Sequence, residues 1–281
     1  MRPPSPGDGS RPEVHPGTAP ARRPAERDLG PPRLARYGAR AALLALALVL
    51  VGIPFGLLLH QVATEGPATG LDDDLARHLN ARLHDEEPAL AILEGISFLG
   101  KPVTLVVVVG AVVVWALVRR ARRLALFLAV TGIGAGIVNT SLKLAVGRAR
   151  PDVEVPVHEA FGLSFPSGHA MLSTACYGAL LVALLPLVPA GWRAAARWAT
   201  VTLVLLIGFS RLTLGVHFLT DVLGGHILGL AWLLASVAAF EAWRSDQWLE
   251  RTHPLEEGID PEGAGRLDRS ARERATSAST G

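Results

Sequence analysis

Long apolar runs alternate with short charged segments along most of the chain. The first run, Ala41–Leu59, contains 19 residues without a charged side chain, about the length needed to cross a hydrocarbon layer ~30 Å thick. Five more runs come after it, at Pro102–Val118, Leu124–Ser141, His169–Ala190, Ala199–Phe209 with some of the residues after Phe209, and Val222–Trp243. The pattern predicts an all-α membrane protein, a bundle of six transmembrane helices.

The two ends of the chain lack this pattern. Residues 1–32 contain repeated Pro, Gly and Arg without apolar periodicity, and residues 244–281 are charged and poor in apolar side chains. Neither segment has enough apolar surface to offset the entropy lost on ordering, so both are predicted to be disordered tails. The expected organisation is one membrane domain, residues 33–243, between two tails.

Arginines beside the apolar runs predict the orientation, because Lys and Arg next to transmembrane helices remain mostly on the cytoplasmic side. If six helices alternate across the membrane, three clusters fall on one side: Arg33, Arg36 and Arg40; Arg119, Arg120, Arg122 and Arg123; Arg193 and Arg197. Both termini are then cytoplasmic. Residues 60–101, 142–168 and 210–221 face the extracytoplasmic side.

The first of these extracytoplasmic segments is acidic and contains a further helical pattern. Leu71, Leu75, Leu79 and Leu83 recur every four residues, with three aspartates at positions 72–74 placed in the first turn, where the helix dipole favours negative charge. The pattern predicts a short helix that comes after the first span and lies on the outer membrane surface. Packing of this helix against the bundle is the alternative.

Composition agrees with a membrane protein and argues against a nucleic-acid-binding protein and a protein held by internal disulfides. Half of the residues are hydrophobic and the mean hydropathy is +0.35, which is apolar for a soluble chain of 29.7 kDa. The net charge is only +2 and the arginines form several short clusters, so nucleic acid is not an expected partner. Cys176 is the only cysteine, which excludes an intramolecular disulfide.

Four cations depart from the orientation rule and mark a candidate anion site. Lys143, Arg148, Arg150 and Arg211 fall on the extracytoplasmic side near predicted helix ends. In the segment KLAVGRARP, Lys143 ends the third apolar run and Arg150 comes seven residues later, just before the helix-breaking Pro151. Cations gathered at this depth predict a negatively charged ligand.

The segment FPSGH comes directly before the fourth apolar run. Ser167 is placed as the cap of the next helix, and the free amides of a helix start attract anions. Gly168 lets a phosphoryl oxygen approach the backbone closely. His169 is placed to give a proton to a departing oxygen.

The segment SRLTLGVHFLTD supplies the remaining chemistry. His217 and Asp221 are four residues apart, which predicts that they share one helix face, with the carboxylate accepting from one ring nitrogen and the other nitrogen free as a nucleophile. Arg211 adds a planar fork of donors suited to two phosphate oxygens. Taken alone, the same pair could be a buried hydrogen bond or half of a zinc site that needs a third ligand.

Together the three segments resemble the signature of the type 2 phosphatidic acid phosphatase superfamily. That signature reads Lys, six residues, Arg-Pro; then Pro-Ser-Gly-His; then Ser-Arg, five residues, His, three residues, Asp. The chain fills all eleven specified positions in order: Lys143, Arg150, Pro151, Pro166, Ser167, Gly168, His169, Ser210, Arg211, His217 and Asp221. The resemblance covers about residues 124–243.

The resemblance implies a six-helix bundle with an extracytoplasmic active site and no metal or other cofactor. His217 is the implied nucleophile, which forms a phosphohistidine; Asp221 orients it, and His169 protonates the leaving oxygen. The implied phosphate ligands are Lys143, Arg150, Ser167, Gly168 and Arg211. The substrate would be a lipid phosphate or diphosphate of the cell membrane, such as phosphatidic acid, phosphatidylglycerol phosphate or undecaprenyl diphosphate.

Some residues and one other function lie outside this signature. Arg148 fills no specified position, so it is expected to contact lipid headgroups or the second phosphate of a diphosphate. Gly132, Gly134 and Gly136 are spaced for close helix packing in lipid. A transporter or scramblase that moves a phosphorylated lipid without hydrolysis is the alternative function, although the six predicted spans do not show an inverted repeat.

Overall fold

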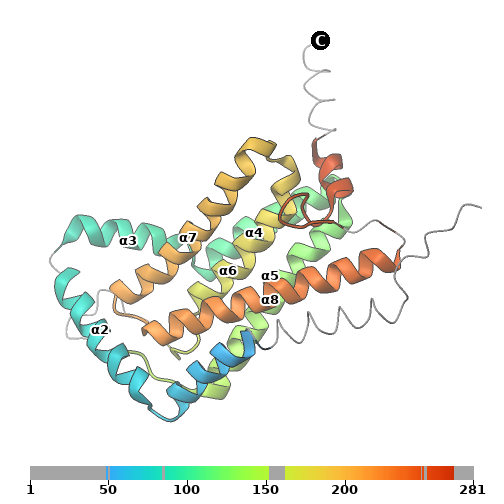
Figure 1. Cartoon of the computed structure of the whole chain (residues 1–281). Coiled ribbons are helices and arrows are strands. Elements are labelled where there is room, and N and C mark those ends of the chain that lie inside the picture. Colours follow the sequence, from blue (N-terminus) through green and yellow to red (C-terminus); the bar gives the residue numbers. More distant parts are fainter. Residues whose placement is uncertain are drawn as a thin grey trace, which may run out of the picture. The chain divides into compact units, whose positions relative to one another are not determined.

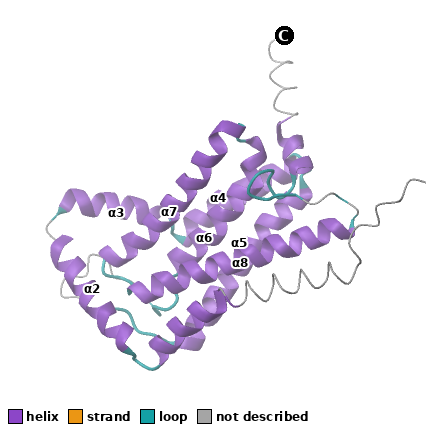
Figure 2. Ribbon diagram, in the orientation of Figure 1, coloured by secondary structure: helices purple, strands orange, loops and turns teal. Residues whose placement is uncertain are grey.

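The computed structural model describes residues 49, 51–83, 86–151, 162–247, 249 and 252–268. The predicted N-terminal tail, residues 1–32, lies outside these residues, as do residues 269–281. Helices joined by turns and loops make up the described part, which contains no strand (Figure 2). The all-α prediction is confirmed for this part of the chain.

The helices succeed one another with short connections (Figure 1). After a helical stretch at Val51–Ala63 come α2 (Pro67–Leu83), α3 (Glu87–Leu99), α4 (Pro102–Val118), α5 (Arg122–Val146), α6 (Gly168–Leu184), the short 3₁₀ turns η1 (Leu185–Leu187) and η2 (Ala190–Trp192), α7 (Arg193–Thr213) and α8 (Leu219–Asp246). A last helical segment covers residues 261–268.

Four helical segments are long and apolar enough to cross a membrane: Arg122–Val146, Gly168–Leu187, Ala190–Thr213 and Leu219–Ser245. The pair α3 and α4, bent by 47° at their junction, makes a fifth if the two count as one span. The first predicted span is described only at residue 49 and from 51 onward. Six spans therefore stay a prediction.

Large apolar side chains lie on both the inside and the outside of the bundle. Leu124, Phe127 and Leu128 of α5 are buried in the main core. On other faces Val106 and Ile133 are exposed to 71% and 66%. Such exposure would cost free energy in water, whereas lipid tails are as apolar as these side chains. The exposed apolar side chains and the helix lengths are together typical of a membrane protein.

Helix α6 packs against α4, α5, α7 and α8, and its contact with α8 is unusually close. A Cβ placed on Gly225 of α8 would come within 2.7 Å of the Ser167 carbonyl oxygen, and one on Gly229 within 2.5 Å of the Met171 carbonyl oxygen. Only glycine allows the two backbones to approach in this way. This contact brings the start of α6 beside the start of α8.

The three glycines predicted to pack helices do so unequally. A Cβ on Gly134 would overlap the Trp232 ring of α8, so close helix packing is confirmed there. The Trp232 indole N–H also donates to the Thr131 carbonyl oxygen at 2.9 Å. Around Gly136, by contrast, there is open space. The absence of a side chain at Gly136 widens a cavity instead of packing a helix.

The acidic segment forms α2, with a different buried face from the one expected. The helix begins at Pro67, so the aspartates lie beyond its first turn. Helix α2 packs on α7 and α8, with Asp72 and Ala76 buried while Leu71 is 70% exposed. Packing against the bundle, the alternative expectation, describes this helix, because Asp72 finds hydrogen-bond partners there.

The C-terminal region differs from the disordered tail expected from position 244 onward. Residues 252–268 pack near the C-terminal end of α6, where the Ile259 N–H donates to the Val182 carbonyl oxygen at 2.9 Å, and Ile259 and Leu267 are buried. The buried Arg244 guanidinium pairs with Asp260 at 3.1 Å and Glu262 at 2.9 Å. The segment is polar overall, but a few apolar contacts and this ion pair stabilise it. The composition alone did not indicate these contacts.

Candidate active site

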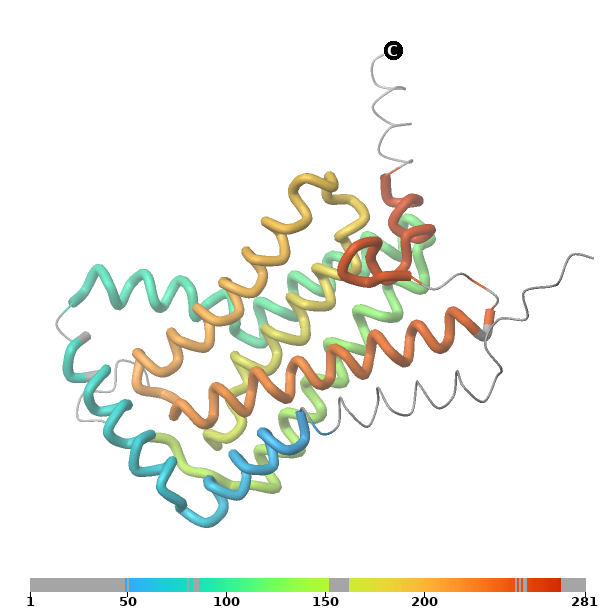
Figure 3. The backbone as a smooth tube through the Cα atoms, viewed as in Figure 1, coloured from blue at the N-terminus to red at the C-terminus, as the bar shows by residue number. Residues whose placement is uncertain are grey.

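The three motifs meet at one end of the bundle, where α5 and α7 end and α6 and α8 begin (Figure 3). Gly147 ends α5 in the left-handed conformation with φ 70°, and its N–H donates to the Lys143 carbonyl oxygen at 3.0 Å. Lys143 therefore occupies the last turn of α5. At the adjoining end, the backbone N–H of Ser167 donates to the Asp221 carbonyl oxygen at 2.9 Å.

His217 and Asp221 are in contact, but not on one helix face as predicted. His217 lies in the turn between α7 and α8, and Asp221 is the third residue of α8. The Asp221 carboxylate folds back over the helix start, where Oδ2 accepts from the Phe218 N–H at 3.0 Å and lies 3.3 Å from His217 Nδ1. The Ser164 hydroxyl donates to the same carboxylate oxygen. The capping geometry of α8 thus orients Asp221 towards the imidazole.

The surroundings of His217 define its protonation. Burial lowers the pKa of His217 to about 4, more than the neighbouring Asp221 carboxylate raises it. The imidazole is therefore neutral at neutral pH. Its Nε2 lies 3.3 Å from Nη1 of Arg150, and a guanidinium can only donate, so the lone pair resides on Nε2 and the proton on Nδ1.

Arg150 is held by the loops on both sides of the site. Its Nε donates to the Gly162 carbonyl oxygen at 3.0 Å, and its Nη1 donates to the Val216 carbonyl oxygen at 2.7 Å. Lys143 is held similarly, with its Nζ donating to the Leu163 carbonyl oxygen at 2.6 Å. The backbone therefore fixes both cations near the Nε2 atom of His217.

Ser167 is the N-cap residue of α6 by position, as predicted, but its hydroxyl makes no cap hydrogen bond. Three buried polar atoms of the motifs have no hydrogen-bond partner among the described residues: Ser167 Oγ, His169 Nε2 and Arg211 Nε. An unpaired buried polar atom costs about 1–3 kcal/mol. A polar ligand bound between the motifs would supply the missing partners.

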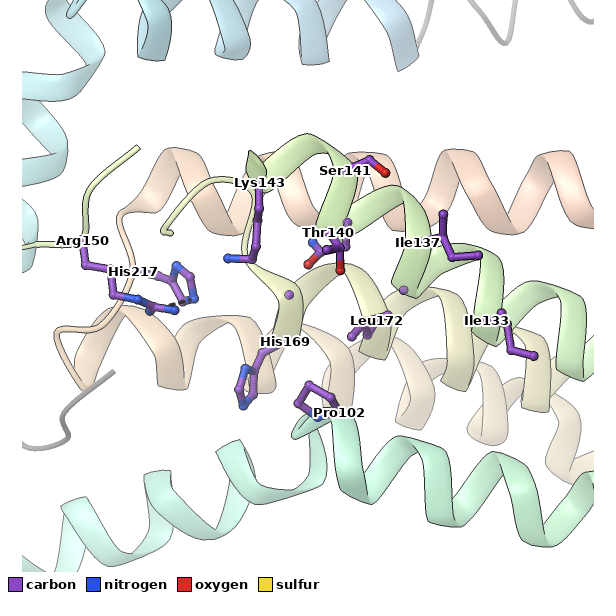
Figure 4. A pocket seen from close by; sticks show the side chains of 13 residues that line it. Pro102, Ile133, Ile137, Thr140, Ser141, Lys143, Arg150, His169, Leu172 and His217 are labelled. Atoms are coloured by element: carbon purple, nitrogen blue, oxygen red, sulfur yellow. Dashed lines mark hydrogen bonds between the residues drawn. The ribbon is translucent and has the colours of Figure 1, made fainter. Parts of the chain in front are cut away.

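One cavity of about 740 Å³ connects the charged and the apolar parts of this region (Figure 4). At one end Lys143, Arg150 and His217 point towards one another, and His169 lies on the opposite wall. At the other end the lining is apolar, with Ile133, Ile137 and Leu172. Both histidines therefore line the same cavity. Gly168 completes its charged end.

Arg211 is placed behind this cavity and not in its lining. It lies in the last turn of α7, buried, and its Nη1 donates to the Ser97 hydroxyl of α3 at 2.5 Å. Five of the eight predicted site residues line the cavity, and the other three, Ser167, Arg211 and Asp221, pack directly around it. The structure has brought all three motifs together.

The sequence of residues 123–245 matches the PAP2 superfamily. The chain contains a PAP2 superfamily domain. All eleven signature positions fall within this PAP2 domain. Helices α5 to α8 also fall within it, except for Arg122, the first residue of α5, and Asp246, the last residue of α8. Helices α2 to α4 and the C-terminal segment lie outside it.

Several relatives share the PAP2 domain. Phosphatidylglycerophosphatase B of Bacillus subtilis is 44% identical over 97 residues, which cover 34% of this chain and 47% of that protein. Undecaprenyl-diphosphatase BcrC of Bacillus subtilis is 31% identical over 115 residues, 40% of this chain and 55% of that protein. The chain thus spans about half the length of the curated relatives it matches.

A solved structure is also similar. The crystal structure of a transmembrane PAP2 type phosphatidylglycerolphosphate phosphatase from Bacillus subtilis matches with a TM-score of 0.58 and 26% identity. The match covers 73% of this chain and 98% of that one. The PAP2 relationship therefore extends to the arrangement of the helices beyond the matched sequence.

Arg148 of the PAP2 domain is placed differently from either expectation. Its Nη1 donates to Asp221 Oδ1 at 2.8 Å and to the Thr220 hydroxyl at 2.7 Å, and its Nη2 donates to Asp72 Oδ2 at 2.9 Å. Arg148 thus contacts two carboxylates, which neither expectation included. Its position two residues before Arg150 was a signal that it belonged to the site. Asp72 and Ser164 gave no comparable signal in the sequence.

Across the ranges that the structure describes, no three His, Cys, Asp or Glu side chains are placed to hold a metal ion together. The carboxylate of Asp221 is instead saturated by an arginine, a serine hydroxyl and a backbone N–H.

Proposed function

We propose that this protein is an integral membrane phosphatase that hydrolyses a phosphomonoester or diphosphate on a lipid through a phosphohistidine. One observation carries the proposal: the neutral Nε2 of His217 faces the Arg150 guanidinium within a cavity whose far end is apolar. A phosphate bound by Arg150 would lie beside the nucleophile. Its lipid chain would extend along the apolar wall.

In the first step, the lone pair of His217 Nε2 attacks phosphorus and the bond from phosphorus to the lipid oxygen breaks. Asp221 accepts a hydrogen bond from Nδ1–H and stabilises the positive charge that develops on the ring. His169 gives its proton to the departing oxygen, so the lipid leaves as an alcohol or as a monophosphate. The bound phosphate dianion favours the protonated form of His169.

In the second step, a water molecule attacks the phosphohistidine. His169 takes a proton from this water, the bond from phosphorus to Nε2 breaks, and inorganic phosphate leaves. Both histidines then return to their starting protonation states. The net reaction consumes one water and needs no other co-reactant.

The phosphate ligands are proposed from charge and from unsatisfied donors. Lys143 and Arg150 supply charge in the cavity, and the start of α6 at Gly168 offers backbone N–H groups. The Ser167 hydroxyl and Arg211 Nε would gain from the phosphate oxygens the partners that they lack among the described residues. This would offset the cost of burying them.

The orientation and substrate class are part of the same proposal. The motif-bearing ends of the helices would face the extracytoplasmic side, opposite the arginine clusters, with both termini in the cytoplasm. Relatives named for phosphatidylglycerophosphate and undecaprenyl diphosphate support a phosphorylated lipid as the substrate. Their names also favour hydrolysis over transport without chemistry.

The test is phosphate release by the purified full-length protein in detergent. Phosphatidylglycerol phosphate, phosphatidic acid and undecaprenyl diphosphate are compared, each with wild type and His217→Ala. We expect release from at least one lipid, unaffected by EDTA and abolished by the substitution. Lipid movement in vesicles without phosphate release would support the transporter instead, and restoration of EDTA-treated protein by Zn²⁺ would support a zinc enzyme.

A further inference from the structure

A buried ion-pair network links Asp221 to a residue outside the PAP2 domain. Arg148 bridges Asp221 and Asp72, at 2.8 Å and 2.9 Å, and the side chains of the two carboxylates are 0% and 1% exposed. The Arg148 side chain is itself only 12% exposed. Asp72 belongs to α2, 76 residues before Arg148 in the sequence. Helix α2 therefore contributes a buried charge that reaches His217 through three successive contacts, by way of Arg148 and Asp221.

Asp72 is held in more than one direction. Its Oδ1 accepts from the Thr220 N–H at 3.0 Å, and its Oδ2 accepts from the Thr220 hydroxyl. The guanidinium of Arg148 stacks over the Phe218 ring, with 4.1 Å from Cζ to the ring centroid. Phe218 and Thr220 come three residues and one residue before Asp221 in the sequence. The network therefore contacts three residues at the start of α8: Phe218, Thr220 and Asp221.

We propose that Asp72 is a positioning residue of the phosphatase reaction, acting through Arg148 to orient the Asp221 carboxylate and balance its charge. The two oxygens of Asp221 have separate tasks: Oδ2 faces His217, while Oδ1 is occupied by Arg148. A partial rotation of the carboxylate would break its contact with His217 Nδ1. A guanidinium held by two carboxylates opposes that rotation.

Charge balance gives the second reason. Arg148 alone would be a cation 2.8 Å from Asp221, and it would weaken the support that this carboxylate gives to a charged imidazole. Asp72 offsets that charge at similar distance. The three groups together carry one net negative charge, as Asp221 would alone. The network therefore fixes the geometry of Asp221 without removing its charge.

The inference rests on the proposed function, since its readout is turnover, and it makes docking of α2 a condition for full activity. The experiment measures kcat and KM for the lipid that wild type hydrolyses, using full-length protein in detergent. Asp72→Asn keeps the shape of the side chain and removes its charge. Asp73→Asn, at an exposed position of the same helix, is the matched control.

For Asp72→Asn we expect kcat to fall by about 10-fold to 100-fold with KM within twofold, because orientation of the dyad is lost and phosphate binding is not. Asp73→Asn should behave as wild type. Arg148→Lys keeps a charge but not a planar fork for two carboxylates, so it should lower kcat by a similar factor.

The acid limb of the pH profile, the fall in kcat/KM at low pH as His217 becomes protonated, distinguishes this role from a merely structural one. Loss of the Asp72 charge should move the limb to lower pH, whereas Arg148→Gln removes a cation and should move it to higher pH. The double variant should return it close to wild type. Arg150 and Arg211 also face the imidazole, and they are unchanged in all of these variants.

Two results would overturn the inference. One is a wild-type kcat in Asp72→Asn. The other is a reduced kcat in Asp72→Asn and Arg148→Gln with the acid limb unmoved in both. If Asp72→Asn does not fold, the neutral double variant Asp72→Asn with Arg148→Gln replaces it, and wild-type kcat there again overturns it. If the wild type releases no phosphate from any of the lipids, or if His217→Ala keeps full activity, the proposed function itself is contradicted.

Discussion

The backbone N–H of Ser167 donates a hydrogen bond of 2.9 Å to the carbonyl oxygen of Asp221. This bond fastens the start of α6 to the start of α8, and hence the segment carrying His169 to the segment carrying His217. It is possible because Gly225 and Gly229 let the two helix backbones approach closely. The geometry of the site therefore depends on helix packing one turn below it.

Gly225→Ala is expected to reduce activity without touching any reactive group. A methyl group there would lie 2.7 Å from the Ser167 carbonyl oxygen, so the helices must separate, at a cost of about 1–3 kcal/mol. We expect a lower thermal unfolding temperature in detergent and at least a tenfold lower kcat. Gly110→Ala, where the space is open, is the control. Equal behaviour of the two variants would contradict this account.

The pH dependence of activity should reflect the low pKa of His217. The nucleophile must be neutral, so its active fraction is complete well above about 4 and is lost as the pH falls through about 4. Asp221→Asn removes the charge that raises this pKa, so the acid limb should move further down while kcat falls by roughly 100-fold or more. The measurement is kcat/KM against pH for both proteins.

The substrate phosphate also ionises near pH 6. This ionisation affects wild type and Asp221→Asn equally, so the difference between their pH profiles reports ionisation of the protein alone. An acid limb of His217 itself near the ordinary histidine value of about 6.5 would contradict the prediction.

Arg150→Lys should be a severe change although it keeps the charge. The guanidinium donates to two loop carbonyls while also facing His217, and an ammonium on a flexible stem cannot reproduce that geometry. We expect kcat/KM to fall by about 100-fold. The same substitution at Arg82, exposed on α2, should have no effect. Activity within threefold of wild type would show that charge alone suffices at this position.

Gly136→Trp should separate the two ends of the cavity. The residue lines the cavity and has open space around it, so the indole would fill the apolar end without displacing a helix. We expect hydrolysis of a long-chain lipid phosphate to fall at least tenfold, while the soluble p-nitrophenyl phosphate is still hydrolysed. Parallel loss of both activities would place the lipid chain elsewhere or indicate misfolding.

Arg244→Ala should destabilise the end of the bundle opposite the site. The substitution leaves Asp260 buried without its guanidinium partner, which costs about 3–5 kcal/mol, and burial already raises the pKa of Asp260. We expect a lower unfolding temperature and faster proteolysis within residues 252–268, with kcat per folded molecule unchanged. Arg122→Ala, at an exposed position, serves as the control. An unchanged unfolding temperature would show that the segment is held by other contacts.

Some parts of the fold could be predicted because their cause is local. Apolar runs long enough to cross a membrane, and prolines and glycines such as Pro102 and Gly147 at helix ends, act within a few residues. The eleven signature residues could be recognised for a similar reason, since they lie in three short segments that resemble a known family pattern. The helix at the C-terminal segment could not be recognised, because its contacts are with other helices, such as the ion pair of Asp260 with Arg244 of α8 and the bond from Ile259 to Val182 of α6.

By itself, the sequence determined the helical character of the chain, its apolar runs and the three motifs that carry the proposed reactive side chains. Only the tertiary structure decided how Asp221 reaches His217, that Arg148 binds Asp72 and Asp221, and that Arg211 contacts Ser97 of α3. Most of these contacts join residues far apart in the sequence, up to 114 positions for Arg211 and Ser97. His217 and Asp221 are close in the sequence, and their geometry depends on where α8 begins. Local periodicity carries no information about which distant helix faces another, so a charge such as Asp72 acquires its partner only when the helices pack.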